Sequence, residues 1–281
     1  MILVKTINEV RQNVKKWKKE GFSVGFVPTM GYLHEGHASL IQRSFKENDK
    51  TVVSVFVNPM QFGPNEDLAS YPRDIMRDKE LCEKMGADLI FNPEPEEVYD
   101  GGFCSYVDMS VLTEDLCGLS RPVHFRGVQT VVSKLFNIVA PDRAYFGEKD
   151  AQQLAIIKRM VKDLNFDIEI VGCPIIREED GLAKSSRNTY LSADERKAAP
   201  IINKSLQLGK KMIENGEKNS KAVIDAIISN IKTEPMADIE YIKIVNLDTI
   251  KPTDTTEGSI LCAAAVRFGN TRLIDNFIIE D

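Results

Sequence analysis

The chain of 281 residues has few of the residues that build disulfide or zinc scaffolds. Its five cysteines are scattered, odd in number and never spaced as C-x-x-C. The sequence therefore indicates neither a disulfide framework nor a zinc site, and a reducing, cytoplasmic compartment is expected.

An excess of positive charge and long hydrophobic runs are also missing. The formal net charge is −6 and the isoelectric point is about 5.3. Such a chain has no surplus of positive charge for coating a nucleic-acid backbone. The apolar run at residues 1–4 is too short for a signal peptide or a membrane span. We therefore expect a soluble, unprocessed protein that acts on small molecules, with neither nucleic acid nor membrane as a partner.

Periodicity in the first part of the chain predicts an α/β fold. Residues 22–27 and 51–57 are apolar, as strands buried on both faces are, and residues 33–46 between them have a helical pattern. This βαβ order predicts a parallel sheet with right-handed crossovers. Further helices are expected at residues 74–85, 128–138 and 152–164, and further strands at residues 88–91, 144–146 and 166–172.

Both ends of the chain contain residues that mark where helices begin and end. Thr6 and Glu9 form a capping box for a helix that Gly21 can end. From about residue 174 the pattern is that of a smaller α+β unit. A second capping box begins at Ser192, and Pro200 predicts a kink or break in the helix that follows. A helix over residues 223–231 and strands at residues 239–245, 260–268 and 273–279 complete this unit, with a hairpin turn at Gly269-Asn270.

Given the 281 residues and a usual domain size of about 100 to 200 residues, we expect two domains. The predicted division is residues 1–175, a Rossmann-like parallel-sheet domain, and residues 176–281, a smaller C-terminal α+β domain.

Two of the three histidines, His34 and His37, lie three residues apart in residues 28–37. On a helix they would share a face, and they follow a predicted strand at a predicted helix start. The first N–H groups of a helix have no intrahelical partner, so a helix start favours phosphate binding. Gly31 and Gly36 would let a nucleotide approach the backbone there.

Four unusual segments follow predicted strands or the predicted domain junction, where βα loops of an open sheet bind ligands. They are residues 28–37, 58–62, 146–150 and 184–188. Each has an ordinary explanation when taken alone, as a polar helix start, a turn or a surface charge, because short motifs match by chance. Together they indicate one site.

The side chains of these segments suit a triphosphate and a hydroxy acid. Lys149 and Arg187 supply positive charge, and the neighbouring serines Ser185 and Ser186 supply hydroxyl donors. Gln61 and Gln153 can bind a hydroxy acid without neutralising a carboxylate that must attack, although Gln153 alone could equally be an exposed helix residue. Asp150 is the nearest acidic candidate for Mg²⁺, which prefers oxygen ligands.

The motifs that carry these residues resemble those of the pantoate-β-alanine ligase family, in the family's order. They are Pro28-Thr29-Met30-Gly31-Tyr32-Leu33-His34-Glu35-Gly36-His37, Val57-Asn58-Pro59-Met60-Gln61-Phe62, Tyr71-Pro72-Arg73, Arg121-Pro122-Val123-His124-Phe125-Arg126-Gly127-Val128, Phe146-Gly147-Glu148-Lys149-Asp150 and Ser185-Ser186-Arg187-Asn188.

The resemblance implies a Rossmann-like nucleotidyltransferase domain, a C-terminal lid domain, a homodimer, and ATP with Mg²⁺ as reactants. It implies that ATP and (R)-pantoate form a pantoyl adenylate, which β-alanine converts to pantothenate with release of AMP. It also implies that Gln61 binds pantoate and β-alanine, that Gln153 binds pantoate, and that Asn58 and His124 line the same pocket.

We expect His34, His37 and Lys149 to be catalytic, as donors to the charge that develops on the phosphate, and the resemblance implies that His37 is the family's assigned acid. The implied ATP-binding residues are Met30, Gly31, Tyr32, Leu33, His34, Glu35, Gly36, His37, Gly147, Glu148, Lys149, Asp150, Ile176, Lys184, Ser185, Ser186 and Arg187. Lys184 departs from the family pattern, which more often has an apolar residue at this place.

Two other functions fit part of the sequence. The first is another adenylate-forming or nucleotidyl-transferring enzyme with an H-x-G-H motif, such as an aminoacyl-tRNA synthetase fragment or a small cytidylyltransferase. The short C-terminal region and the acidic isoelectric point disfavour tRNA as its substrate. The second is a nucleotide-sensing protein without turnover, against which the full set of His34, His37, Lys149, Ser186 and Arg187 argues.

Overall fold

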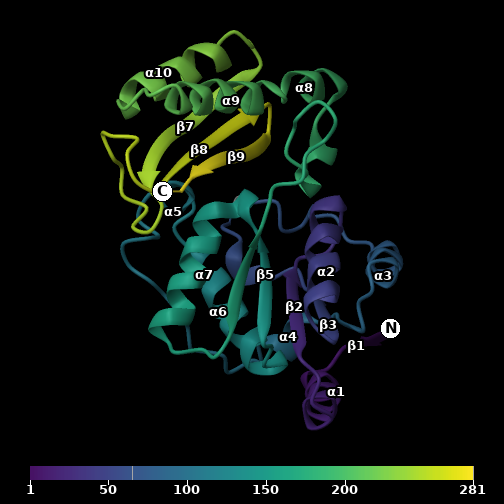
Figure 1. Ribbon diagram of the computed structural model, residues 1–281. Coiled ribbons are helices and arrows are strands. Elements are labelled where there is room, and N and C mark those ends of the chain that lie inside the picture. Colours follow the sequence, from purple (N-terminus) through teal and green to yellow (C-terminus); the bar gives the residue numbers. More distant parts are fainter. Residues whose placement is uncertain (65, 281) are drawn as a thin grey trace. The chain divides into compact units, whose positions relative to one another are not determined.

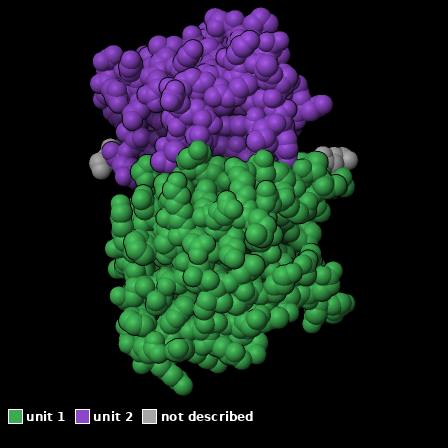
Figure 2. Space-filling view, turned by 90° about the vertical axis from the view of Figure 1, so that its right-hand side faces the viewer, with its two compact units in different colours: residues 1–110, 120–148, 156–174 green, residues 111–119, 149–155, 175–281 purple. Residues whose placement is uncertain are grey.

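The computed structural model describes residues 1–64 and 66–280, which form two compact units (Figures 1 and 2). Unit 1 contains Met1–Ser110, Ser120–Glu148 and Ile156–Pro174. Unit 2 contains Val111–Leu119, Lys149–Ala155 and the chain from Ile175 onward. Two short segments from the first 175 residues therefore belong to unit 2.

A six-stranded parallel sheet forms the centre of unit 1 (Figure 1). The strands in spatial order are β1 (Ile2–Val4), β4 (Leu89–Phe91), β3 (Lys50–Val55), β2 (Val24–Thr29), β5 (Arg143–Gly147) and β6 (Glu169–Cys173). The order reverses between β2 and β5, which is the place where open α/β sheets bind ligands at the carboxyl ends of their strands. The predicted Rossmann-like sheet is confirmed, whereas the short edge strand β1 was not predicted.

Helices cover both faces of this sheet, in agreement with the predicted βαβ pattern. The longer ones are α1 (Ile7–Lys19), α2 (Glu35–Glu47), α3 (Ile75–Lys84), α6 (His124–Val139) and α7 (Ala151–Asp163), whose first turn belongs to unit 2. Unit 1 also has the short helices η1 (Pro59–Gln61) and α4 (Pro95–Val98), whereas most of α5 (Cys117–Ser120) and of η2 (Glu148–Asp150) belongs to unit 2. The predicted start of α6 at residue 128 was wrong by one turn, since the helix begins at His124.

Alternating side chains of the central strands fill the cores on the two faces. Val27 and Tyr145 join a buried cluster that includes Ile41 of α2. On the opposite face, Phe26 packs edge-on against Phe136 of α6, with ring centroids 6.4 Å apart. Successive residues of a strand point to opposite faces, so helices can bury both sides of the sheet.

Pro28 lies inside β2, although the predicted strand ended at residue 27. β2 pairs with β3 as far as Thr29, but with β5 only at Gly25 and Phe26. Within the described part of the chain, β2 therefore has no paired strand on its β5 side beyond Phe26. A proline is tolerated there because its missing N–H leaves no ladder hydrogen bond unmade.

Unit 2 is a three-stranded antiparallel sheet packed against helices, which confirms the predicted α+β unit. Its elements are η3 (Ser186–Tyr190), α8 (Ala193–Ala198), α9 (Ile201–Glu214), α10 (Ser220–Ile231), β7 (Ala237–Asn246), β8 (Ile260–Phe268) and β9 (Thr271–Ile279). Pro200 separates α8 from α9, as predicted. Phe268 pairs with Thr271 across Gly269-Asn270, where Gly269 has a φ of 54°, so the predicted hairpin turn is confirmed.

Candidate functional site

The loop that joins β2 to α2 has a backbone that only certain residues can adopt. Gly31 has a φ of 84° and Tyr32 has a φ of 50°. A Cβ atom at Gly31 would lie 2.9 Å from Cγ1 of Val55 and 3.0 Å from Oδ2 of Asp78. Gly31 is therefore required both by the left-handed backbone and by close packing.

Side chains bind three successive backbone N–H groups of this loop. The Gly31 N–H donates to Oγ1 of Thr29 at 3.2 Å. The Tyr32 and Leu33 N–H groups donate to the two carboxylate oxygens of Asp78, at 2.8 and 2.7 Å. The loop that leads to the histidines is thus fixed by hydrogen bonds of the fold itself.

His34 and His37 lie together, but not on one helix face as their spacing predicted. His34 is the N-cap residue, with an extended backbone (φ −136°, ψ −179°), whereas His37 belongs to the first turn of α2. Their ring centroids are nevertheless 4.1 Å apart. The cap position brings the rings together because it turns the His34 side chain back over the start of the helix.

The two imidazoles form a reciprocal cap. Nδ1 of His34 accepts the N–H of Gly36 at 3.1 Å, and Nδ1 of His37 accepts the N–H of His34 at 3.3 Å. A ring nitrogen that accepts cannot carry a proton, so the neutral form of each ring carries its proton on Nε2. Two N–H groups at the helix start are thereby bound within the fold, and Nε2 is the ring nitrogen that carries the proton in each neutral histidine.

The carboxyl end of β3 leads to a buried group of amides. Asn58 is 1% exposed, and its Nδ2 donates to Oε1 of Gln61 and to the backbone oxygen of Gly127, both at 3.1 Å. Oδ1 of Asn58 accepts the hydroxyl of Tyr99 at 2.8 Å. Burial raises the pKa of Tyr99, so this hydroxyl stays protonated and donates.

Gln61 also connects this group to the β2 loop and to α6. Its Nε2 lies 2.8 Å from Sδ of Met30, and its backbone oxygen lies 3.0 Å from Nδ1 of His124. A Cβ atom at Gly127 would lie 2.3 Å from the backbone oxygen of Met60, so only glycine lets α6 approach η1 this closely. Unit 1 therefore brings together four of the predicted residues, Met30, Asn58, Gln61 and His124.

Tyr99 and Asp78 contact this region, but the sequence analysis did not select them. Neither lies in one of the motifs that indicated the site. Asp78 occupies the first turn of α3, where an acidic residue is ordinary because it favours the helix dipole. Only the packing of α3 beside the β2 loop reveals its role.

In unit 2, Lys149 and Asp150 follow the end of β5. Asn276 of β9 donates from Nδ2 to the backbone oxygen of Lys149 at 2.9 Å, which fixes the main chain there. Nζ of Lys149 lies 3.9 Å from Oδ1 of Asp150, and these side chains are 20% and 49% exposed. Gln153, on the next turn, is half-buried beside Gln152, which donates to the backbone oxygens of Leu112 and Asp115 at 2.8 Å.

The segment from Ile176 to Asn188 also lies in unit 2. The N–H of Lys184 donates to the oxygen of Ile176 at 2.9 Å, and Nζ of Lys184 pairs with Oε2 of Glu178 at 2.7 Å. This ion pair gives a structural explanation for the lysine at this position. Oγ of Ser185 accepts the N–H of Arg187 at 3.3 Å and so caps η3, which carries Ser186 and Arg187.

The predicted site residues divide between the two units. Unit 1 holds Met30, Gly31, Tyr32, Leu33, His34, Glu35, Gly36, His37, Asn58, Gln61, His124, Gly147 and Glu148, and unit 2 holds Lys149, Asp150, Gln153, Ile176, Lys184, Ser185, Ser186 and Arg187.

The described residues contain no cluster of three or more His, Cys, Asp or Glu side chains that could hold a metal ion. Among the helices of residues 1–64 and 66–280, none combines the length and apolar character needed to cross a membrane.

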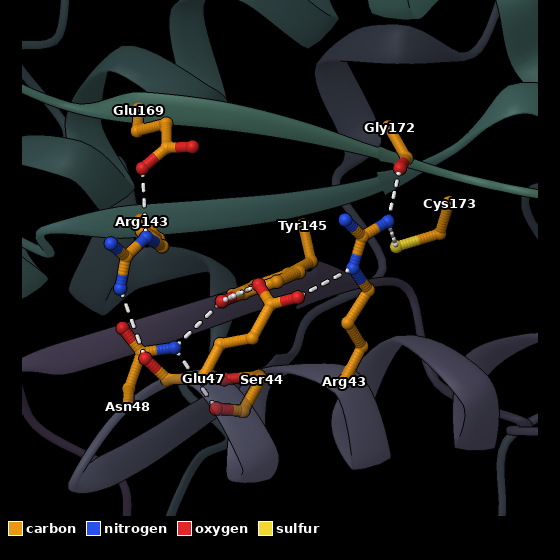
Figure 3. A network of polar contacts seen from close by, with 9 residues as sticks. All are labelled: Arg43, Ser44, Glu47, Asn48, Arg143, Tyr145, Glu169, Gly172 and Cys173. Atoms are coloured by element: carbon orange, nitrogen blue, oxygen red, sulfur yellow. Dashed lines mark hydrogen bonds and ion pairs between the residues drawn. The ribbon is translucent and has the colours of Figure 1, made fainter.

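A polar network at the far end of α2 fixes the helix that carries the histidines (Figure 3). Tyr145 of β5 donates to Oε2 of Glu47 at 2.9 Å and accepts from Nδ2 of Asn48 at 2.7 Å. Arg43 connects Oε1 of Glu47, at 2.9 Å, to the backbone oxygen of Gly172 in β6, at 2.7 Å. The arginine lowers the pKa of Glu47, which therefore stays ionised and keeps its hydrogen bonds.

Comparison with known proteins identifies the family of the chain. The family model described as pantoate-beta-alanine ligase matches residues 2–278. The chain belongs to the pantoate-beta-alanine ligase family. This confirms the resemblance that the motifs predicted, and with it the prediction of an enzyme of this family.

Similar proteins of this family cover the whole chain. The pantothenate synthetase of Enterococcus faecalis is 62% identical over 280 residues, which are 100% of this chain and 99% of that protein. That of Ruminiclostridium cellulolyticum is 63% identical over 274 residues, which are 98% and 97% of the two chains.

Solved structures of this family have the same fold. The pantothenate synthetase of Thermus thermophilus superposes with a TM-score of 0.95 at 44% identity and covers 100% of both chains. The pantoate-beta-alanine ligase of Francisella tularensis, solved in complex with beta-gamma ATP and beta-alanine, gives a TM-score of 0.80 at 34% identity over 99% of this chain and 97% of that one.

Proposed function

We propose that the chain condenses (R)-pantoate with β-alanine to form pantothenate, with ATP cleaved to AMP and pyrophosphate through a pantoyl adenylate. The reciprocal cap of His34 and His37 carries this proposal. It places two Nε2–H donors at the carboxyl end of β2, beside the strand-order reversal of the sheet. The complex of the Francisella tularensis ligase with beta-gamma ATP and beta-alanine supports the assignment of ATP and of one substrate.

In the first step the pantoate carboxylate attacks the α-phosphorus of ATP, and pyrophosphate leaves. Two anions must approach each other, so catalysis comes mainly from positioning and from donors aimed at the developing charge. We assign this task to His34, His37 and Lys149, and we assign to His37 the role of the acid. Met30 to His37, Gly147 to Asp150, Ile176 and Lys184 to Arg187 are proposed to bind ATP.

The buried amides of unit 1 suit the hydroxy acid. Gln61 is buried and held by Asn58, so its position is set before any ligand binds. A neutral amide can orient pantoate without lowering the nucleophilicity of its carboxylate. We therefore assign pantoate to Gln61 and Gln153, β-alanine to Gln61, and the walls of the pocket to Asn58 and His124.

In the second step the amine of β-alanine attacks the acyl carbon of the adenylate, the acyl–phosphate bond breaks and AMP leaves. The amine attacks in its neutral form and loses one further proton as the amide forms. Solvent or a phosphate oxygen can accept that proton, so the chain need not supply a dedicated base. No covalent enzyme intermediate is required.

We propose that Mg²⁺ enters as the complex with ATP. Asp150 is largely exposed and lies next to Lys149, so it fits at most one position in the ion's shell. We further propose that residues 1–175 form the ATP- and pantoate-binding domain and residues 176–281 a lid domain, and that the enzyme is a cytoplasmic homodimer.

Two assays test the reaction. The purified chain is incubated with ATP, Mg²⁺, pantoate and β-alanine, and AMP release is followed by a coupled reaction. Isotope exchange between pyrophosphate and ATP should require pantoate but not β-alanine. Exchange that depends on an amino acid instead would indicate a synthetase-like enzyme, and ATP binding without any exchange would indicate a nucleotide sensor.

A further inference from the structure

Asp78 is a buried carboxylate that no motif of the sequence explains. It is 1% exposed, although it belongs to a helix at the margin of unit 1. Both of its oxygens accept backbone N–H groups, from Leu33 at 2.7 Å and from Tyr32 at 2.8 Å. A carboxylate with two short hydrogen bonds to adjacent amides holds both the position and the direction of that stretch of main chain.

The stretch that it holds contains one strained residue. Tyr32 is not a glycine but has a φ of 50°, and such a left-handed conformation persists only where the surroundings determine it. The guanidinium of Arg77, next to Asp78, stacks over the Tyr32 ring with 4.4 Å between its central carbon and the ring centroid. Two neighbouring side chains of α3 therefore fix the main chain and the side chain of Tyr32.

The loop leads directly to the cap of α2. Leu33, the second residue bound by Asp78, is followed by His34, whose N–H and ring both take part in the reciprocal histidine cap. A shift of the loop would move the His34 N–H away from Nδ1 of His37. It would also remove the donor that fixes which nitrogen of His37 carries the proton.

Keeping a carboxylate in this place is costly. Burial raises the pKa of Asp78 above its usual range, although the N–H groups of Leu33 and Tyr32 act in the opposite direction. An apolar side chain would avoid this cost but would leave two buried N–H groups without acceptors. The arrangement is therefore suited to holding the loop in one geometry.

We propose that Asp78 is a positioning residue for adenylate formation: by binding the Tyr32 and Leu33 amides it aligns the Nε2–H groups of His34 and His37. This inference rests on the proposed function, because its kinetic test needs the pantoate-dependent reaction. It assigns Asp78 no contact with substrate.

The test compares two aspartates of the same helix. Asp78→Asn keeps the shape of the side chain but turns one acceptor into a donor that faces a backbone N–H. Asp74→Ala is the matched control, since Asp74 only caps α3 by accepting the N–H of Arg77 at 3.1 Å. We expect Asp78→Asn to lower the kcat of pantoate-dependent pyrophosphate exchange by about 10- to 100-fold, with KM for ATP and pantoate within about threefold. Asp74→Ala should stay within about twofold of the wild type.

A spectroscopic measurement separates positioning from general destabilisation. The chain has only three histidines, so long-range ¹H–¹⁵N spectra resolve each ring, and single His→Asn variants assign them. In the wild type, His34 and His37 should show unprotonated Nδ1 and protonated Nε2. In Asp78→Asn these rings should show mixed tautomers or broadened signals, while His124 and the spectrum of Asp74→Ala stay unchanged.

The outcomes are distinct. Wild-type kcat and unchanged His34 and His37 tautomers in Asp78→Asn would overturn the proposal, as would equal losses of kcat in both aspartate variants. If the wild type itself shows no pantoate-dependent exchange, the proposed function fails, and the tautomers of His34 and His37 still decide whether Asp78 positions the rings.

Discussion

His34 and His37 cap the same helix start, each ring accepting one backbone N–H through Nδ1. This relationship explains why two histidines are useful at this place. Because Nδ1 of each ring accepts a backbone N–H, the direction of the Nε2–H group is fixed. The charge of the triphosphate can then be met by donors that need no reorganisation during the reaction.

Replacing His34 by asparagine should separate its two roles. Asparagine is a good N-cap residue, so His34→Asn should keep the thermal unfolding midpoint close to that of the wild type. It lacks the Nε2–H donor, so adenylate formation should fall by about 100- to 1000-fold. His34→Ala should lose the cap as well, with about 0.5–2 kcal/mol less free energy of unfolding. If His34→Asn turns over at the wild-type rate, His34 is not a catalytic residue.

Removal of the Gln61 amide should affect pantoate and β-alanine but not ATP. Gln61→Ala should raise the KM for pantoate by about tenfold or more, because one well-placed hydrogen bond to a charged group contributes about 1.5–3 kcal/mol. Calorimetry on the separate ligands should show ATP binding unchanged. Gln61→Glu serves as the second variant, since its negative charge should repel the pantoate carboxylate. A loss of ATP affinity in Gln61→Ala would contradict the assignment.

The raised pKa of Asp78 predicts how stability depends on pH. The folded state holds the Asp78 proton more tightly than the unfolded chain does, so ionisation of Asp78 favours unfolding. The free energy of unfolding of the wild type, measured relative to Asp78→Asn, should therefore fall as the pH rises above about 4, the usual Asp value. Urea titrations of both proteins across this range give the difference. If this difference in the free energy of unfolding instead rises with pH, the hydrogen bonds from the Tyr32 and Leu33 N–H groups outweigh the cost of burying the charge.

The Tyr145 hydroxyl should matter for stability rather than for chemistry. Tyr145 is fully buried, and Tyr145→Phe leaves Glu47 and Asn48 each without one hydrogen bond (Figure 3). The free energy of unfolding should fall by about 1–3 kcal/mol, with kcat close to wild type. Tyr106→Phe is the matched control, because the Tyr106 side chain is exposed and its change should be small. A large loss of kcat in Tyr145→Phe would show that the network also positions the histidines.

The side chain of Lys184 should prove replaceable, although the residue belongs to the segment that we propose to bind ATP. Its partner Glu178 is partly exposed, and such ion pairs contribute about 0–1 kcal/mol. Lys184→Met should therefore change the free energy of unfolding by less than about 1 kcal/mol and the kcat of the full reaction by less than about threefold. Glu178→Gln removes the same pair from the other side and should behave alike. A much larger loss in Lys184→Met alone would indicate that the ammonium group contacts ATP.

Much of the fold follows from local patterns. The capping boxes at Thr6 and Ser192, the break at Pro200 and the hairpin turn at Gly269 depend on neighbouring residues, so the sequence predicts them correctly. Strand β1 was not predicted, because a strand of three residues is too short to show an alternating hydrophobic pattern. Its formation depends on β4, which is far away in the chain.

The sequence by itself determined the chemistry available to this protein: the histidine pair, the amides, Lys149 and Arg187, and the order of motifs that marks the family. Only the tertiary structure decided how these groups are held. Asp78 and Tyr99 reach the β2 loop and Asn58 through contacts 45 and 41 residues apart in the chain. The tautomers of His34 and His37 follow from acceptor geometry at a helix cap. Such long-range contacts leave no periodic trace in the sequence, because any acidic or aromatic residue on a helix or loop fits the local pattern equally well.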